Sequence, residues 1–211
     1  KNLTRYDKEE MAYPLTATSL NSLIDYINGK QKELRDSMII HVESPTKVRL
    51  ISGLTKERNR EELFCVTTNP NGFEFDHAYD QERFIINMQT AFEQTDETAL
   101  ILTVAGNVES KTVANYGDDG TSQKATISKG IAGKEDVLVP NPVILRPYRT
   151  FLEVEQPESK FIFRIKEGND GQPFFKLIEA DGGIWKYEAV ASIKEYLMEN
   201  INPALGITII G

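Results

Sequence analysis

The sequence has few of the residues on which catalysis at neutral pH usually depends. Its 211 residues include two histidines, one cysteine and one tryptophan. Most catalytic sites use a histidine, an activated thiol, a bound metal or paired carboxylates. His41 and His77 lie far apart, and Cys65 lies inside an apolar run. We therefore predict that the protein is not an enzyme, and we expect no cofactor.

Long apolar runs and a secretory leader are also missing from the sequence. The longest apolar candidate, residues 99–105, is far shorter than the ~20 residues that cross a bilayer. The first residues are polar and charged, so we expect no membrane partner. A single cysteine excludes an internal disulfide and fits an intracellular setting. Because the chain begins with Lys1, we expect it to be trimmed or a fragment.

Acidic residues outnumber basic ones, 32 to 24, which gives a formal net charge of −8. Nucleic-acid binding without sequence preference depends on cations that meet phosphates, so the overall charge disfavours it. A local basic patch can override that average. Hydrophobic residues at 40% and charged residues at 27% are ordinary for a globular protein of one large or two small domains.

Four segments have apolar residues at helical spacing. The first follows Thr18 or Ser19 as the N-cap and is expected to continue past Gly29 to residue 35. The second begins near Asp80 and the third near Thr95, although β-branched residues in the third also suit a strand. The four apolar stripes are Leu20, Leu23, Ile24 and Ile27; Phe84, Ile85, Met88 and Phe92; Leu100, Ile101, Val104 and Val108; and Val190, Ile193 and Leu197.

Strand-like runs between turn residues make up most of the rest. We expect a three-stranded meander of 38–42, 47–51 and 62–68 against the first helix. The predicted fold is α+β, with antiparallel sheets (a meander and long hairpins) covered by three to four helices. We expect an N-terminal α+β region, 1–130, and a C-terminal sheet with the final helix, 131–211, packed as one compact unit. The later strands are expected at 112–116, 123–128 (around a loop at 117–120), 137–139, 143–154, 160–166 and 174–179.

Basic and aromatic residues gather in the predicted C-terminal sheet. The candidate ligand- or nucleic-acid-binding residues are Arg146, Tyr148, Arg149, Arg164 and Lys166. Cations interleaved with aromatic rings bind phosphates and stack bases, and Arg149 and Arg164 are expected to meet on adjoining strands. Cross-strand ion pairs are the commoner outcome, because glutamates share these strands. The same region also carries Lys160, Lys176, Glu153, Glu155, Glu158 and Glu167.

One acidic cluster resembles a metal-binding set. Asp76, His77 and Asp80, with Glu82, lie within seven residues and are the weak candidate ligands for a divalent cation. An acidic helix start after a solvated loop explains the same residues, so we expect no metal. Trp185 is expected to fill core space beside the last helix.

Several segments resemble the phage and prophage family typified by YfdQ. They are Glu82–Glu93 (ERFIINMQTAFE), Gly120–Gln123 (GTSQ), Val139–Pro142 (VPNP) and Phe161–Ile165 (FIFRI). The likeness spans residues 15–200 in element order, and the tryptophan-containing segment that precedes the family's first long helix is absent. The resemblance implies a phage gene product that lacks its N-terminal segment here. The family has no assigned activity, so no catalytic or binding residue carries over.

The resemblance implies a phage-encoded protein, and the missing catalytic residues favour a non-enzymatic one that acts by self-assembly or by binding a protein partner. Exposed sheet edges, such as 143–154, would make the contacts of a homo-oligomer. A nucleic-acid accessory protein of phage recombination or replication, and a nucleotide-sequestering anti-defence protein, are the alternatives. A metal-dependent hydrolase ranks last. The expected location is the cytoplasm of the infected bacterial host.

Overall fold

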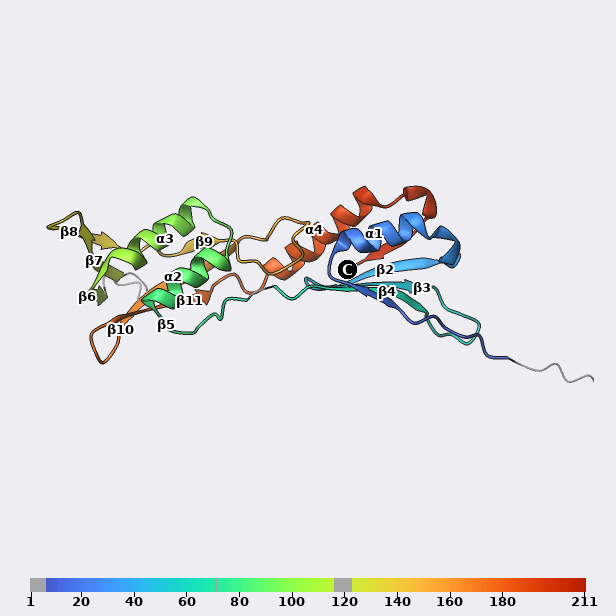
Figure 1. The fold of residues 1–211 in the computed structure, drawn as a ribbon, viewed down its shortest axis with the longest axis horizontal. Helices are drawn as coiled ribbons and strands as arrows, with labels where there is room; N and C mark the ends of the chain where they lie inside the picture. The colour runs from blue at the N-terminus through green and yellow to red at the C-terminus, as the bar shows by residue number, and fades with distance from the viewer. Residues whose placement is uncertain (1–6, 71, 116–122) are drawn as a thin grey trace, which may run out of the picture. The chain divides into compact units, whose positions relative to one another are not determined.

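The computed structural model describes residues 7–70, 72–115 and 123–211, and its fold is α+β (Figure 1). The chain forms two compact units. Unit 1 comprises Lys1–Asn69, Thr150–Val154 and Val190–Gly211, and unit 2 comprises Pro70–Arg149 and Glu155–Ala189. The division therefore does not follow the expected boundary at residue 130, because the C-terminal segment joins the first sheet. The predicted loop at 117–120 lies outside the described residues.

Unit 1 is built on a five-stranded sheet with the order β1-β4-β3-β2-β12. The central strands β2, β3 and β4 form the predicted antiparallel meander. The two outer strands, β1 and β12, are parallel to their neighbours, and local sequence did not predict either. The strands are β1 (Leu15–Ala17), β2 (Met38–Ser44), β3 (Lys47–Ser52), β4 (Glu62–Thr67) and β12 (Thr208–Ile210).

Helix α1 (Leu20–Gly29) begins at the predicted cap, where Ser19 accepts a hydrogen bond from the backbone of Ser22. The expected continuation to residue 35 is wrong. The backbone N–H of Lys30 closes the last turn on Tyr26, and the chain continues as the short 3-10 helix η1 (Gln31–Glu33). Gly29 is a poor helix former, which explains why the helix ends there.

The core of unit 1 lies between one face of the sheet and two helices. Helix α1 and the C-terminal part of α4 (Trp185–Asn200) cover that face (Figure 1). Because side chains alternate along a strand, every second residue of β2 and β3 is buried against the helices. The buried set includes Leu20, Leu23, Ile27, Met38, Ile40, Val42, Val48, Leu50, Phe64, Val66, Phe151, Ile193 and Leu197.

Unit 2 contains a four-stranded sheet, β5-β11-β10-β9, and a three-stranded sheet, β6-β7-β8, and both are antiparallel. Buried Phe84 stacks on Phe163 and Phe175, with ring centroids 5.6 and 5.0 Å apart. The strands are β5 (Tyr79–Asp80), β6 (Val108–Asn115), β7 (Gln123–Lys129), β8 (Gly133–Leu138), β9 (Val143–Leu145), β10 (Ser159–Glu167) and β11 (Pro173–Glu179).

Helices α2 (Gln81–Thr90) and α3 (Asp96–Asn107) begin at predicted caps. Asp80 accepts from the backbone of Arg83, and Thr95 forms a capping box with Thr98. The helical interpretation of the third apolar stripe is confirmed, and the strand alternative is wrong.

The expected strand 143–154 is only three residues long, because β9 ends at Leu145. Pro147 cannot donate a ladder hydrogen bond and stops the pairing with β10. Residues 150–154 then belong to unit 1, where the Thr150 hydroxyl donates a hydrogen bond to the carbonyl of Pro45 (2.5 Å). This segment is therefore not the long sheet edge that the sequence predicted.

Candidate functional site

The sheet face of unit 1 that points away from the helices is lined by half-buried side chains. Ile39 lies opposite Ile51 in the register, and His41 lies opposite Arg49. A solvated sheet face usually alternates to polar residues, so a pair of isoleucines here departs from that pattern. We call this surface the open face; it comprises Ile39, His41, Glu43, Lys47, Arg49, Ile51, Glu62, Cys65 and Ile210.

The charged residues of the open face are joined in ion pairs. Glu43 Oε2 lies 2.8 Å from Arg49 Nε, and its Oε1 lies 3.3 Å from Lys47 Nζ. Arg49 Nη1 also lies 3.7 Å from Glu62 Oε2. Burial raises the pKa of Glu43, but the hydrogen bond from Lys47 and the charge of Arg49 outweigh it and leave that pKa below its usual value. Two acids and two bases thus balance one another on this surface.

Cys65, on the same face, is half-buried and carries a free thiol. Burial raises the pKa of the Cys65 thiol, and the nearby charge of Glu62 raises it further. A thiol with a raised pKa is protonated at neutral pH and is a poor nucleophile.

Sequence reasoning did not identify the open face. The signal was present in 38–42 and 47–51, because apolar residues occupy both alternating sets of positions in these runs. One set fills the core and the other lines the open face.

In unit 2, Arg149 lies inside an aromatic cluster and not on an exposed surface, since it is only 9% exposed. Its guanidinium carbon lies 4.1 Å from the ring centroid of Trp185. Phe161 and Phe75 lie 5.7 and 5.9 Å away. These distances are those of cation–π contacts, which strengthen where water is excluded.

The two terminal nitrogens of the Arg149 guanidinium donate hydrogen bonds to polar side chains. Nη1 donates to Glu179 Oε1 at 2.7 Å, and Nη2 donates to the hydroxyl of Ser159. That hydroxyl donates in turn to Asp181 Oδ2 at 2.7 Å. Burial lowers the pKa of Arg149 to about 10, against the opposing effect of Glu179 and Asp181. Arg149 therefore stays cationic at neutral pH, and its contacts hold the aromatic cluster of unit 2 together.

Trp185 is the first residue of α4 and is half-buried. The sequence predicted that it fills core space, whereas its ring stacks on a cation.

Arg146 forms the ion-pair network that was the commoner expectation for this region. Nη2 lies 2.8 Å from Glu158 Oε1, and Nη1 contacts Glu155 and lies 3.9 Å from Glu93. The hydrogen bonds to Glu155 and Glu158 raise the pKa of Arg146. Tyr148 is half-buried, and its backbone donates to Ala91 at 2.9 Å.

Arg164 and Lys166 lie on β10 at the positions that alternate with buried Phe161, Phe163 and Ile165. Arg149 contacts the ring of Phe161, so it lies on the other side of the strand. The structure therefore does not bring Arg149 and Arg164 together on one face.

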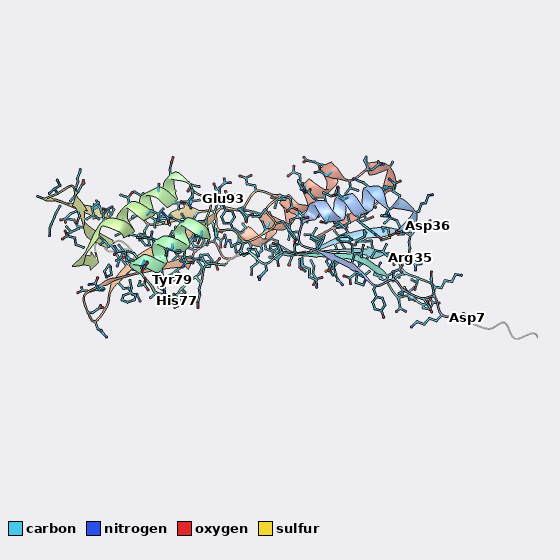
Figure 2. All side chains as sticks on the ribbon, viewed as in Figure 1. Asp7, Arg35, Asp36, His77, Tyr79 and Glu93 are labelled. Atoms are coloured by element: carbon cyan, nitrogen blue, oxygen red, sulfur yellow. The ribbon has the colours of Figure 1, made fainter. Side chains whose placement is uncertain are left out.

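The weak metal candidates have separate partners. Asp76 forms an ion pair with Lys176, and Asp80 caps α2. His77 packs edge-on against Tyr79, with ring centroids 4.7 Å apart, and its Nδ1 lies 3.9 Å from Glu74 Oε1. Both His77 and Tyr79 are labelled in Figure 2. Among the residues that the structure describes, no group of three or more histidines, cysteines or carboxylates is placed to hold a metal ion.

Comparison with protein-family models, with curated proteins and with solved structures gives no match in any of the three. Within the described ranges, none of the helices combines the length and the apolar character needed to cross a membrane.

Proposed function

We propose that the protein is a non-enzymatic binding protein that associates with copies of itself through the open face of unit 1. The observation that carries the proposal is a sheet face with one exposed and two half-buried isoleucines and with internally balanced charge. Ile210 is 43% exposed, and Ile39 and Ile51 are half-buried. Apolar side chains gathered on one face are typical of interaction surfaces.

A second copy suits this surface better than a polyanion does. The ion-paired cations, Lys47 and Arg49, are matched by Glu43 and Glu62, which leaves no positive excess for phosphates. A two-fold axis brings the same surface to both sides of an interface, which requires a self-complementary surface. Sheets pack face to face in this way, and each isoleucine that loses its remaining exposure contributes on the order of 1 kcal/mol.

The phage origin and the action inside an infected bacterial cell belong to this proposal and rest on the YfdQ-type resemblance. Self-association fits that setting, because symmetric homo-oligomers are the commonest assemblies of soluble chains. The raised pKa of Cys65 supports a binding role for the open face over nucleophilic chemistry there.

Light scattering coupled to size-exclusion chromatography tests the proposal directly. The wild-type chain is expected at a multiple of its 23.8 kDa mass. Ile51→Glu replaces one of the paired isoleucines of the open face with a charge and is expected to give monomers. Leu54→Glu is the matched control, since Leu54 is 50% exposed in the loop that follows β3. Cooperative unfolding of both variants shows that the fold is kept.

A charge exchange provides a second test. Arg49→Glu makes the open face acidic and Glu43→Lys makes it basic, so each variant alone is expected to associate less than wild type. An equimolar mixture is expected to restore the complex, because the two altered faces attract each other. A monomeric wild type at high concentration, or an Ile51→Glu variant with unchanged mass, contradicts the proposal.

A further inference from the structure

In the hairpin of β10 and β11 in unit 2, the basic residues all lie on one of the two faces. One alternating set of its residues is buried in the core, and the other set is exposed or half-buried. In the register, Arg164 lies directly opposite Lys176, and Lys166 lies opposite Phe174. We call this second set the basic face; it comprises Lys160, Ile162, Arg164, Lys166, Phe174, Lys176 and Ile178.

Acidic residues of the two strands lie at positions of the opposite set. Glu167 and Glu179 are the acids within β10 and β11, and Glu179 pairs with Arg149. Like charges directly opposite each other on neighbouring strands destabilise a sheet, so the Arg164–Lys176 pair has a cost. Asp76 offsets part of it through its ion pair with Lys176. Lys160, Arg164 and Lys166 occupy the exposed or half-buried positions of β10, and this row of cations is a candidate anion site.

We infer that the basic face binds single-stranded nucleic acid. Alternate residues of a strand lie ~6.8 Å apart, so the cations of β10 form a row along which a phosphate backbone can run. Phe174 offers an aromatic ring beside Lys166 for base stacking. The ring packs against Gly168, where a Cβ would lie 2.6 Å from its Cε2 atom, so this glycine allows the close approach.

Single strands fit this surface better than duplexes do. The major groove of duplex DNA admits a two-stranded β-ribbon, whereas β10 and β11 are the inner strands of a wider, four-stranded sheet. Here the opposite face of the hairpin is buried by Phe161, Phe163 and Phe175. One surface with the cations of β10 and an aromatic ring therefore remains, with Asp80 opposite Phe174 at its β5 edge; proteins that bind single strands by stacking and by charge combine the same two kinds of group.

Fluorescence anisotropy with a labelled oligo(dT) strand at low salt tests the inference. Three cations, Lys160, Arg164 and Lys166, that each neutralise a phosphate predict a log–log salt slope of about −2.1, since Lys176 is already paired with Asp76. Arg164→Glu and Lys166→Glu are each expected to weaken binding at least tenfold, and Phe174→Leu roughly fivefold through lost stacking. Lys32→Glu is the matched control, because Lys32 is an exposed cation in unit 1 and is expected to change binding little.

The outcomes separate this inference from self-association. Ile51→Glu is expected to keep the oligo(dT) interaction, since the basic face lies in unit 2. No anisotropy change at low salt overturns the inference. If the protein binds poly-glutamate as tightly as it binds oligo(dT), and Phe174→Leu changes neither affinity, the inference is also overturned, in favour of an acidic protein partner. Unfolding followed by Trp185 fluorescence shows which variants remain folded.

Discussion

Replacing Arg149 with alanine removes the cation at the centre of the aromatic cluster of unit 2. The guanidinium lies 4.1 Å from the Trp185 ring centroid and donates to Glu179 at 2.7 Å. Truncation leaves a cavity beside Phe161 and leaves the carboxylates of Glu179 and Asp181 without their cation. We expect unit 2 to lose stability without a change in its fold.

The size of the loss follows from burial. Breaking a buried ion pair costs roughly 3–5 kcal/mol, and a desolvated cation–π contact contributes ~2 kcal/mol. The Glu179 side chain is 41% exposed, so water can solvate its carboxylate once Arg149 is gone. We therefore expect about 3 kcal/mol for Arg149→Ala. Arg149→Lys keeps the charge but loses the planar stacking group, and we expect about 1.5 kcal/mol.

Urea unfolding followed by tryptophan fluorescence measures this directly, because Trp185 is the single tryptophan of the chain. Lys166→Ala, at an exposed position on β10, is the control and is expected to change stability by less than ~0.5 kcal/mol. A loss below ~1 kcal/mol for Arg149→Ala would refute the reasoning. Equal stability of the lysine variant and the wild type would show that planar stacking on Trp185 adds nothing.

Two further predictions concern buried polar contacts. The side-chain amide of buried Gln123 donates a hydrogen bond to the Ile165 carbonyl and accepts one from the Ile165 N–H, both at 2.8 Å. Gln123→Leu is therefore expected to lower the free energy of unfolding, measured by thermal unfolding, by roughly 2–4 kcal/mol. An unchanged stability contradicts this. The backbone N–H of Ala12 and the charge of Arg35 (labelled in Figure 2) lower the pKa of Glu61 despite its burial. Its contribution is therefore complete above the unfolded-state pKa of ~4.3 and is lost as the pH falls through the lower folded-state value. Glu61→Gln should lower the urea midpoint at pH 7 and flatten its decline below pH ~4.3; an unchanged decline would count against the contact.

Local periodicity predicted the elements whose burial is set by their own sequence. The stripe of Phe84 and Met88 gave α2, and the alternation in 38–42 and 47–51 gave the first hairpin. Strand β12 was not predictable, because its three residues pair with β2, far away in the chain. Its assignment depends on a contact between distant segments, which no local pattern contains.

The candidate site shows the same limit. The sequence assigned the cations to one C-terminal sheet and placed Arg149 and Arg164 on one face of it, whereas Arg146 and Arg149 lie in the loop after β9. Pro147 ends β9, and the loop after it carries Arg149 to the buried side, where Trp185 and Phe75 come from distant segments. The alternation of β10 alone does place Arg164 and Lys166 on one side, and that part of the prediction agrees with the register.

Sedimentation equilibrium over a wide concentration range tests the central claim most directly. If the open face joins copies of the chain, the measured mass of the wild type is a multiple of 23.8 kDa. The Ile51→Glu variant then has the monomer mass of 23.8 kDa, and the Leu54→Glu variant has the same mass as the wild type. A wild-type chain that remains at 23.8 kDa at every concentration contradicts the account.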